Sequence, residues 1–375
     1  MEPFKNNISQ QLVSCFADHL EKQVSSFERA NFEASILQDL NNLELKERAQ
    51  LIATHIHLIL PSDHQSRFKI IKAMLRPINE DQPNSQSDER GITGWGMLPL
   101  GMVVGQHGLA AFDEALDLLK DMTSQFSSEF DVRYFLIADQ DRALDIMKSW
   151  VNDPNYHVRR LVSEGTRPRL PWAMQLKQLI ADPSPTLPLL EALRDDKEEY
   201  VRRSVANHLN DIAKDHPDLV ADLAGKWMRG ANLQRKKLLR HACRTLIKQG
   251  HPAALKAFGI EAPKIDLTDL SIKTKVVNLG SELVFTVDLR STCSKPQSLI
   301  IDYILHFKKA NGTMVGKVFK WKTLSLDAHS TITLEKKHSI RIITTRRYYD
   351  GQQGLSLRIN GQDFGFEEFA LNKNH

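Results

Sequence analysis

An internal repeat in the middle of the chain restricts the folds that it can adopt. Residues 153–164 (DPNYHVRRLVSE) and residues 196–207 (DKEEYVRRSVAN) each place a Val-Arg-Arg triplet after a polar turn, and Val158 and Val201 are 43 residues apart. This period and this order of turn and helix are typical of HEAT-type helical pairs. Because one pair cannot bury its apolar face alone, neighbouring pairs stack into a solenoid with one concave surface. We therefore predict a helical solenoid in which both valines are buried.

The spacing of apolar residues changes after Pro263. Before it they recur every three or four positions, which predicts helices, and after it they alternate with polar residues, which predicts strands. Asn311-Gly312 and Asn360-Gly361 each separate two alternating runs, as in β-hairpins. The sequence therefore predicts a mainly α protein with two domains: a HEAT-like helical-repeat solenoid over residues 1–262 and a smaller, all-β, immunoglobulin-like sandwich over residues 263–375.

The composition excludes several classes of protein. The chain has 375 residues, of which 41% are hydrophobic and 26% are charged, as in ordinary globular proteins. Its three cysteines are far apart and show no C-x-x-C spacing, which argues against a disulfide framework or a zinc site and fits a reducing compartment. No apolar run approaches the ~20 residues that cross a bilayer, and the N-terminus lacks the features of a signal peptide. We expect a cytoplasmic protein that binds neither a membrane nor a metal.

Positive charge is concentrated in two parts of the chain. From Lys264 to the end there are 17 Lys and Arg against 11 Asp and Glu, whereas the net charge of the whole chain is only +4. Residues 225–260 contain nine Lys and Arg and no acidic residue. Such a basic stripe is typical of a surface that binds a polyanion, and a solvated helix face is the alternative. The stripe includes Lys236, Lys237, Arg240 and Arg244.

The segment 163–172 (SEGTRPRLPW) is the best candidate for a catalytic site, since the chain has none of the common catalytic motifs such as a P-loop or G-x-S-x-G. Gly165, Pro168 and Pro171 predict that a helix ends early and leaves Glu164 at its terminus. Two interpretations are open: a plain ion-pair network, or a carboxylate that meets a bound cation beside Trp172 while arginines hold phosphates. The surrounding arginines are Arg159, Arg160, Arg167 and Arg169.

Three long motifs carry a resemblance to a known enzyme family. They are SEGTRPRLPW at 163–172, YVRRSVANHLND at 200–211 and RHACRTLIKQG at 240–250. With these motifs the helical part resembles the AlkC branch of the HEAT-like DNA alkylation-repair glycosylases, a subgroup of which carries an immunoglobulin-like module. The sister AlkD branch frames its lesion with a Trp followed four residues later by an Asp. None of the five tryptophans here has an Asp at that spacing, so the site residues of the AlkD branch cannot be assigned to positions in this sequence.

The resemblance implies a DNA glycosylase that excises cationic alkylated bases, chiefly 3-methyladenine and 3-methylcytosine, from double-stranded DNA in base excision repair. An alkylated cationic base is already a good leaving group, and cleavage passes through an oxocarbenium-like sugar, as in glycoside hydrolysis. Such an enzyme needs preorganised negative charge and a placed water, and the family is held to act without base flipping. We expect a monomeric, monofunctional hydrolase without a cofactor, associated with the nucleoid when bound to DNA.

The resemblance also assigns roles to single residues. Glu164 is the first candidate for stabilising the cation and placing the water. Glu129 is the second, although an ion pair with Arg133 four residues later is equally possible. Asp211 is a third candidate that could merely close its helix, and Trp172 would pack against the deoxyribose or the base. The DNA phosphates would be held by Arg159, Arg160, Arg167, Arg169, Arg202, Arg203, Lys236, Lys237, Arg240 and Arg244, and by Arg346 and Arg347 of the sandwich, unless these last two form a hairpin edge.

Two other functions fit the same sequence. One is a non-catalytic HEAT-repeat scaffold that binds DNA or protein, and the other is a protein that binds RNA. A fold alone never establishes chemistry, so the catalytic hypothesis depends on the carboxylates framed by arginines. It makes a geometric prediction: Glu164 and Glu129 must lie close together and face the same inner surface.

Overall fold

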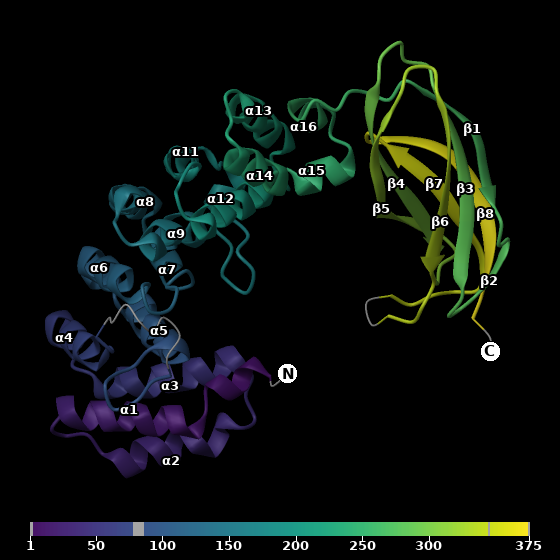
Figure 1. The fold of residues 1–375 in the computed structure, drawn as a ribbon. Coiled ribbons are helices and arrows are strands. Elements are labelled where there is room, and N and C mark those ends of the chain that lie inside the picture. The colour runs from purple at the N-terminus through teal and green to yellow at the C-terminus, as the bar shows by residue number, and fades with distance from the viewer. Residues whose placement is uncertain (1–2, 78–85, 344–345, 374–375) are drawn as a thin grey trace. The chain divides into compact units, whose positions relative to one another are not determined.

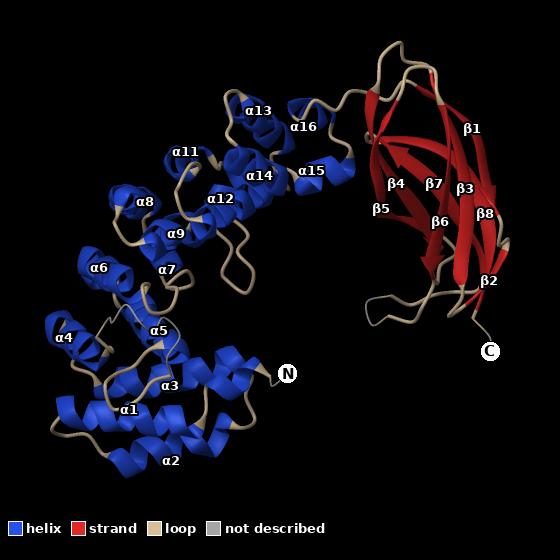
Figure 2. Cartoon of the chain, in the orientation of Figure 1, coloured by secondary structure: helices blue, strands red, loops and turns tan. Residues whose placement is uncertain are grey.

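The computed structural model describes residues 3–77, 86–343 and 346–373. Helices occupy the chain up to Ala257 and strands begin at Ile265, so the change predicted near Pro263 is observed (Figure 2). By packing, the chain divides into two compact units, Met1–Asp215 and His216–His375. The division into domains 1–262 and 263–375 stays a prediction, because it follows the change in secondary structure, whereas the compact units follow the packing.

The first unit is built of helices that follow one another along the chain (Figure 1). They are α1 (Gln10–Gln23), α2 (Arg29–Leu40), α3 (Leu45–Ile59), α4 (His64–Met74), α5 (Met97–His107), α6 (Phe112–Met122), α7 (Val132–Ala138), α8 (Gln140–Ser149), α9 (Tyr156–Gly165), α10 (Lys177–Ala181), α11 (Leu187–Leu193) and α12 (Glu199–Ile212). Single 3-10 turns lie at η1 (Phe4–Asn7), η2 (Gly94–Gly96), η3 (Leu109–Ala111), η4 (Trp150–Asn152) and η5 (Ser184–Thr186). Neighbours pack on one another, such as α1 on α2 and α5 on α6, in the manner of a helical repeat.

The two copies of the repeat form α9 and α12, which pack against each other. Val158 and Val201 are buried between helices, as predicted, with 4% and 0% of their surface exposed. The side chain of Asn155 caps the start of α9 by accepting a hydrogen bond from the backbone N–H of His157. The helix ends at Gly165, so that Glu164 lies in its last turn, as the sequence predicts.

Where the structure describes it, the second unit combines four helices with two β-sheets. The helices are α13 (Pro217–Met228), α14 (Leu233–Ala242), α15 (Arg244–Gln249) and α16 (Pro252–Ala257). The strands in the described residues are β1 (Ile265–Ile272), β2 (Val276–Asn278), β3 (Glu282–Ser291), β4 (Gln297–Lys308), β5 (Met314–Leu326), β6 (Thr331–Ser339), β7 (Gly351–Ile359) and β8 (Gln362–Asn372). One sheet has the order β1-β3-β6 and the other β2-β8-β7-β4-β5, with all pairs antiparallel except β2 and β8. This is the predicted immunoglobulin-like sandwich.

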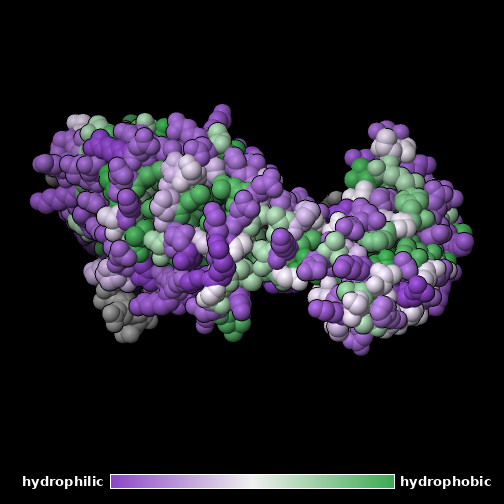
Figure 3. Space-filling model, turned by 90° about the horizontal axis from the view of Figure 1, so that it is seen from above, coloured by the Kyte–Doolittle hydropathy of each residue, from purple (hydrophilic) through white to green (hydrophobic). Residues whose placement is uncertain are grey.

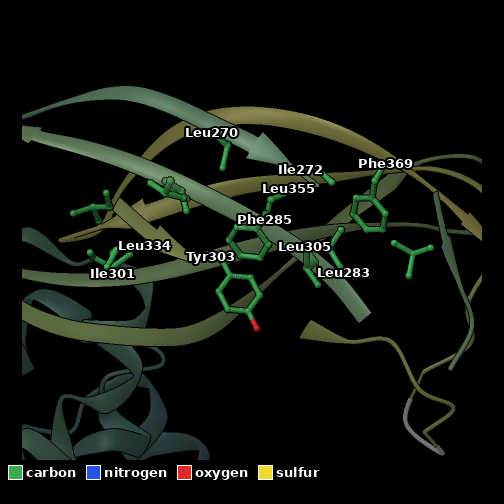
Figure 4. Close-up of a cluster of buried hydrophobic side chains, with 14 of the residues drawn as sticks. Leu270, Ile272, Leu283, Phe285, Ile301, Tyr303, Leu305, Leu334, Leu355 and Phe369 are labelled. Carbon is green, nitrogen blue, oxygen red and sulfur yellow. The ribbon is translucent and has the colours of Figure 1, made fainter. Parts of the chain in front are cut away.

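The sandwich core lies between the two sheets (Figure 4). Alternate residues of β3 are buried, and among them Phe285 contacts Tyr303 of β4 with ring centroids 5.4 Å apart. The two Asn-Gly pairs form the predicted hairpins, β4 to β5 and β7 to β8. The second turn has Asn360 at φ 45° and Gly361 at φ 82°, a left-handed conformation that these residue types tolerate.

The last helices and the sandwich meet at a close backbone contact within the second unit. A Cβ atom on Gly250, which ends α15 at φ 78°, would lie 2.2 Å from the backbone of Gly361. The side-chain amide of Asn360 donates to the carbonyl of Glu261 at 2.8 Å. Glycine is therefore needed on both sides of this contact.

The described residues contain no helix that combines the length and apolar character needed to cross a membrane. They also contain no cluster of three or more His, Cys, Asp or Glu side chains that could hold a metal ion. Hydrophilic residues predominate on the face shown in Figure 3, with smaller hydrophobic groups between them.

Candidate active site

A cavity of about 880 Å³ opens on the first unit, and residues from distant parts of the chain line it. Its polar side contains the carboxylates of Glu129 and Glu164 and the guanidinium of Arg160. Its flat walls are aromatic and come from Trp95, Phe126, Phe130, Tyr156, Trp172 and Tyr200. Negative charge beside aromatic faces is the combination that binds a flat cation.

Arg160 lies between the two carboxylates that the sequence singled out. Its Nη1 donates to Glu129 Oε2 at 2.5 Å, and its Nη2 lies 3.5 Å from Glu164 Oε1. The guanidinium also lies 5.0 Å from the ring centroid of Tyr200. The structure thus brings Glu129 and Glu164 together at one cavity, as the geometric prediction requires, whereas their catalytic role stays a prediction.

Glu164 is held rigidly and stays ionised. Its Oε1 accepts a hydrogen bond from Arg167 at 2.6 Å, and its Oε2 accepts one from the Ser204 hydroxyl at 2.6 Å. Burial alone would raise the pKa of Glu164, but Arg160, Arg167 and Ser204 together lower that pKa below its ordinary value. Glu164 is therefore a fixed negative charge at neutral pH, with both oxygens already bonded.

Glu129 lies in the turn before α7 and keeps one oxygen available. Its Oε2 accepts hydrogen bonds from Ser127 and Arg160, but no group in the described residues donates to its Oε1. Its side chain is 15% exposed, against 7% for Glu164. The predicted alternative, an ion pair with Arg133, is wrong, because Arg133 turns away and donates to backbone carbonyls. Of the two carboxylates, Glu129 is the better placed to contact water.

Asp211 lies outside the cavity and bonds to Arg167, one of the residues that line it. Its Oδ2 accepts a hydrogen bond from Arg167 Nε at 2.8 Å and lies 2.8 Å from Arg167 Nη2 in an ion pair, and its Oδ1 accepts a hydrogen bond from Lys214 at 2.8 Å. Only 3% of its side chain is exposed, and it is not among the residues that line the cavity. Asp211 therefore orients Arg167, which in turn holds Glu164.

Trp172 lies at the rim of the cavity with a strained backbone. It is 70% exposed and has φ 65°, which is unusual for a bulky residue. Such a conformation costs about 1–3 kcal/mol and persists only where neighbours hold it. Lys46 of α3 supplies part of that support by donating from Nζ to the Trp172 carbonyl at 2.5 Å. An exposed indole at the rim is free to meet a ligand.

The structure corrects the expectation that Arg159 and Arg167 bind phosphate. Arg159 is buried and forms a bidentate pair with Asp196 at 2.6 and 3.0 Å, and Arg167 is buried between Glu164 and Asp211. A buried guanidinium whose donors are already taken by carboxylates is not available to a phosphate.

Arg160, also predicted to hold phosphate, is instead paired with Glu129 and Glu164, whereas the remaining predicted arginines of the first unit stay nearer the surface. Arg169 pairs with Asp215, Arg202 donates to the carbonyls of Asp196 and Lys197, and Arg203 is exposed beside Glu199.

The predicted phosphate contacts of the second unit differ in exposure. Lys236, Lys237 and Arg240 are exposed on α14, and Arg244 is exposed on α15, where it donates to the carbonyl of His241. Arg346 packs over the rings of the sandwich, with its guanidinium 4.2 Å from the Phe307 centroid, whereas Arg347 is exposed. These last two residues lie between β6 and β7, outside the strands that form hairpins.

Comparisons with known proteins agree with this fold. Residues 120–246 match a family described as "DNA alkylation repair enzyme", and residues 266–373 match the C-terminal Ig-like domain of an uncharacterised protein, YhaZ. The chain is 35% identical over 364 residues to the uncharacterized protein YhaZ of Bacillus subtilis (strain 168), covering 96% of this chain and 97% of that one. It is also similar to the solved structure of the Pseudomonas fluorescens alkylpurine DNA glycosylase AlkC bound to DNA containing an abasic site analog, with 33% identity, a TM-score of 0.84, and coverage of 99% and 100% of the two chains. The chain belongs to the AlkC family of DNA alkylation repair proteins.

Several residues of this AlkC-family site were missed by the sequence analysis. Lys46 and Trp95 reach the cavity from helices far from the recognised motifs, so no local pattern could have indicated them. Ser204 could have been predicted from the sequence, because it occupies the position in the second repeat at which the first repeat has the apolar Leu161. A hydroxyl at an otherwise apolar helix position indicates a buried polar partner, which here is Glu164.

Proposed function

We propose that this AlkC-family protein is a DNA glycosylase that hydrolyses the N-glycosidic bond of cationic alkylated bases, 3-methyladenine and 3-methylcytosine, in double-stranded DNA. The observation that carries the proposal is the pair of carboxylates, Glu129 and Glu164, at a cavity with aromatic walls. Preorganised negative charge stabilises a sugar that becomes cationic, and aromatic faces suit a flat cationic base. The likeness to an alkylpurine DNA glycosylase over the whole chain supports the same activity.

The proposed reaction has two bond changes. The bond between C1′ and the base nitrogen breaks, and its electron pair goes to the base, which leaves as a neutral molecule. Water then adds to C1′ of the oxocarbenium-like sugar and loses a proton, which leaves an abasic site. Glu164, with both oxygens bonded, supplies fixed negative charge. Glu129, with Oε1 available, orients the water and accepts its proton.

DNA binding in this proposal depends on exposed cations. The candidates are Arg203, Lys236, Lys237, Arg240 and Arg347, all of which are exposed. Because the alkylated base is already a good leaving group, the enzyme need supply only part of the driving force. We therefore propose that it acts without flipping the base into an enclosed pocket, unlike most glycosylases.

Incubation of the purified protein with methylated duplex DNA tests the proposal. The wild type should release 3-methyladenine, and Glu129→Gln and Glu164→Gln should each slow release by about 10²–10³-fold, since each removes a charge that the transition state needs. The affinity of both variants for DNA should stay within about threefold of the wild-type affinity, because neither carboxylate binds phosphate. Glu114→Gln, at an exposed position of α6, is the matched control. Binding of DNA without release of base by the wild type would instead support the non-catalytic scaffold.

A further inference from the structure

Arg133 of α7 is a buried cation beneath the segment that frames the site. It is 0% exposed, and all of its hydrogen bonds go to backbone carbonyls. Its Nε donates to Met174 at 2.7 Å, and its Nη1 donates to Gly165 at 2.9 Å and to Arg167 at 2.8 Å. No group in the described part of the chain forms a hydrogen bond with its Nη2. Burial and the nearby Arg167 lower the pKa of Arg133 to about 10, so it remains charged at neutral pH.

Gly165 is the last residue of α9, and Arg167 and Met174 lie toward the two ends of the connection, residues 166–176, that joins α9 to α10. This connection carries Arg167, which holds Glu164, and Trp172, which forms the cavity rim. Its own backbone hydrogen bonds are few and local, such as those from Ala173 to Leu170 and from Leu176 to Pro168. Arg133 is therefore the side chain that ties the backbone at both ends of the connection to the helical scaffold.

A charge in this position is not explained by packing. A buried ion is costly unless hydrogen bonds and nearby opposite charges compensate it, and an apolar side chain of similar volume would fill the same space. Arg133 has no hydrogen bond to a carboxylate, although Glu129, Asp211 and Glu164 stabilise its charge from a distance. Unlike an apolar side chain, the guanidinium has several N–H donors in one plane. These donors fix the positions of several carbonyls at once.

We propose that Arg133 is a positioning residue: it fixes the backbone of residues 165–174 so that Arg167 and Trp172 keep the geometry that the site requires. The effect on catalysis rests on the proposed function, whereas the effect on the order of the segment does not. Arg133 acts through its neighbours and does not itself line the cavity.

Hydrogen exchange and single-turnover excision, measured on the full-length protein, test this proposal. In Arg133→Met the amides of residues 166–176 should exchange about 10-fold faster or more, because local opening of the segment becomes easier. Excision should slow by about 100-fold, the scale expected when reacting groups are misplaced by about 1 Å, while affinity for DNA changes little. Arg133→Lys keeps the charge but not the planar set of donors, so both effects should be smaller.

Arg67→Met is the matched control. Arg67 of α4 is also buried, with 6% of its surface exposed, and donates to the carbonyls of Pro61, Ser62 and His107, none of which lines the cavity. The Arg67→Met substitution should lower the overall stability of the protein, but the amides of residues 166–176 should exchange no faster than in the wild type. The proposal is overturned if Arg67→Met and Arg133→Met give the same exchange pattern. If Arg133→Met does not fold, Arg133→Lys is measured alone. The proposal is then overturned if residues 166–176 of Arg133→Lys exchange as slowly as those of the wild type. Absence of excision by the wild type would reject the proposed function, and the exchange result would still decide the role of Arg133.

Discussion

Arg167 links the two groups of charges at the site. It contacts Glu164 on one side and Asp211 on the other, and its side chain is only 9% exposed. Both carboxylates are themselves buried, with 7% and 3% of their side chains exposed. Ser204 and Lys214 also bond these carboxylates, but Arg167 is the partner that the two share, so its loss weakens the pairing of both buried charges at once.

Arg167→Met should lower the free energy of unfolding by about 3–5 kcal/mol, because it leaves two buried carboxylates without their shared partner. Chemical denaturation at pH 7 measures this loss. Arg203→Met is the comparison, because Arg203 forms an exposed pair with Glu199, and such pairs contribute about 0–1 kcal/mol. Equal losses in the two variants would show that the buried network does not hold the site together.

At the scale of secondary-structure elements, the contact between α9 and α12 includes a buried histidine. His208 of α12 lies 2.9 Å from the Ser163 carbonyl of α9 through its Nδ1, which must carry the hydrogen because a carbonyl only accepts. Its Nε2 has no hydrogen-bond partner among the described residues, and burial lowers the pKa of His208 from 6.5 to about 4. The helix pair therefore requires a neutral histidine.

This requirement predicts a loss of stability in mild acid. The unfolded chain protonates His208 near pH 6.5, whereas the folded chain does not until pH falls to about 4. The contribution is thus fully present above pH 6.5 and is lost as pH falls toward 4, by up to about 3 kcal/mol. His208→Asn, which keeps a donor near the position of Nδ1, should flatten the fall in unfolding free energy between pH 7 and pH 5. His329→Asn, at an exposed position, is the control, and an equal flattening there would refute the prediction.

At the scale of the whole molecule, the uneven charge distribution predicts how DNA binding responds to salt. Lys236 and Lys237 are exposed in a stretch of the sequence without acidic residues. If both contact phosphates, Lys236→Gln with Lys237→Gln should reduce the slope of log K against log salt by about 1.8, since each contact releases about 0.9 counterion. Fluorescence anisotropy with undamaged duplex DNA at several salt concentrations measures the slope. Lys69→Gln with Lys148→Gln, two exposed lysines outside the basic stripe, should leave it unchanged, and the same change in both pairs would argue against a localised DNA surface.

Local chemistry determined much of this protein from sequence alone. The period of apolar residues predicted helices before Pro263 and strands after it, the Val-Arg-Arg repeat predicted the burial of Val158 and Val201, and Gly165 predicted the end of α9. The apolar period and the helix end depend on neighbours a few residues apart, and the repeat on two similar segments, so all three can be read directly from the order of amino acids.

The pairing of charges was decided by tertiary structure. Sequence placed four arginines near Glu164 but could not show that Asp196 and Asp211 would engage Arg159 and Arg167, or that Arg160 would lie between Glu129 and Glu164. It likewise could not show that Glu129 keeps one oxygen available, or that Lys46 reaches Trp172 from α3. The physical reason is that an ionic side chain binds the partner that folding brings within about 3 Å, and no local pattern in the chain records that distance.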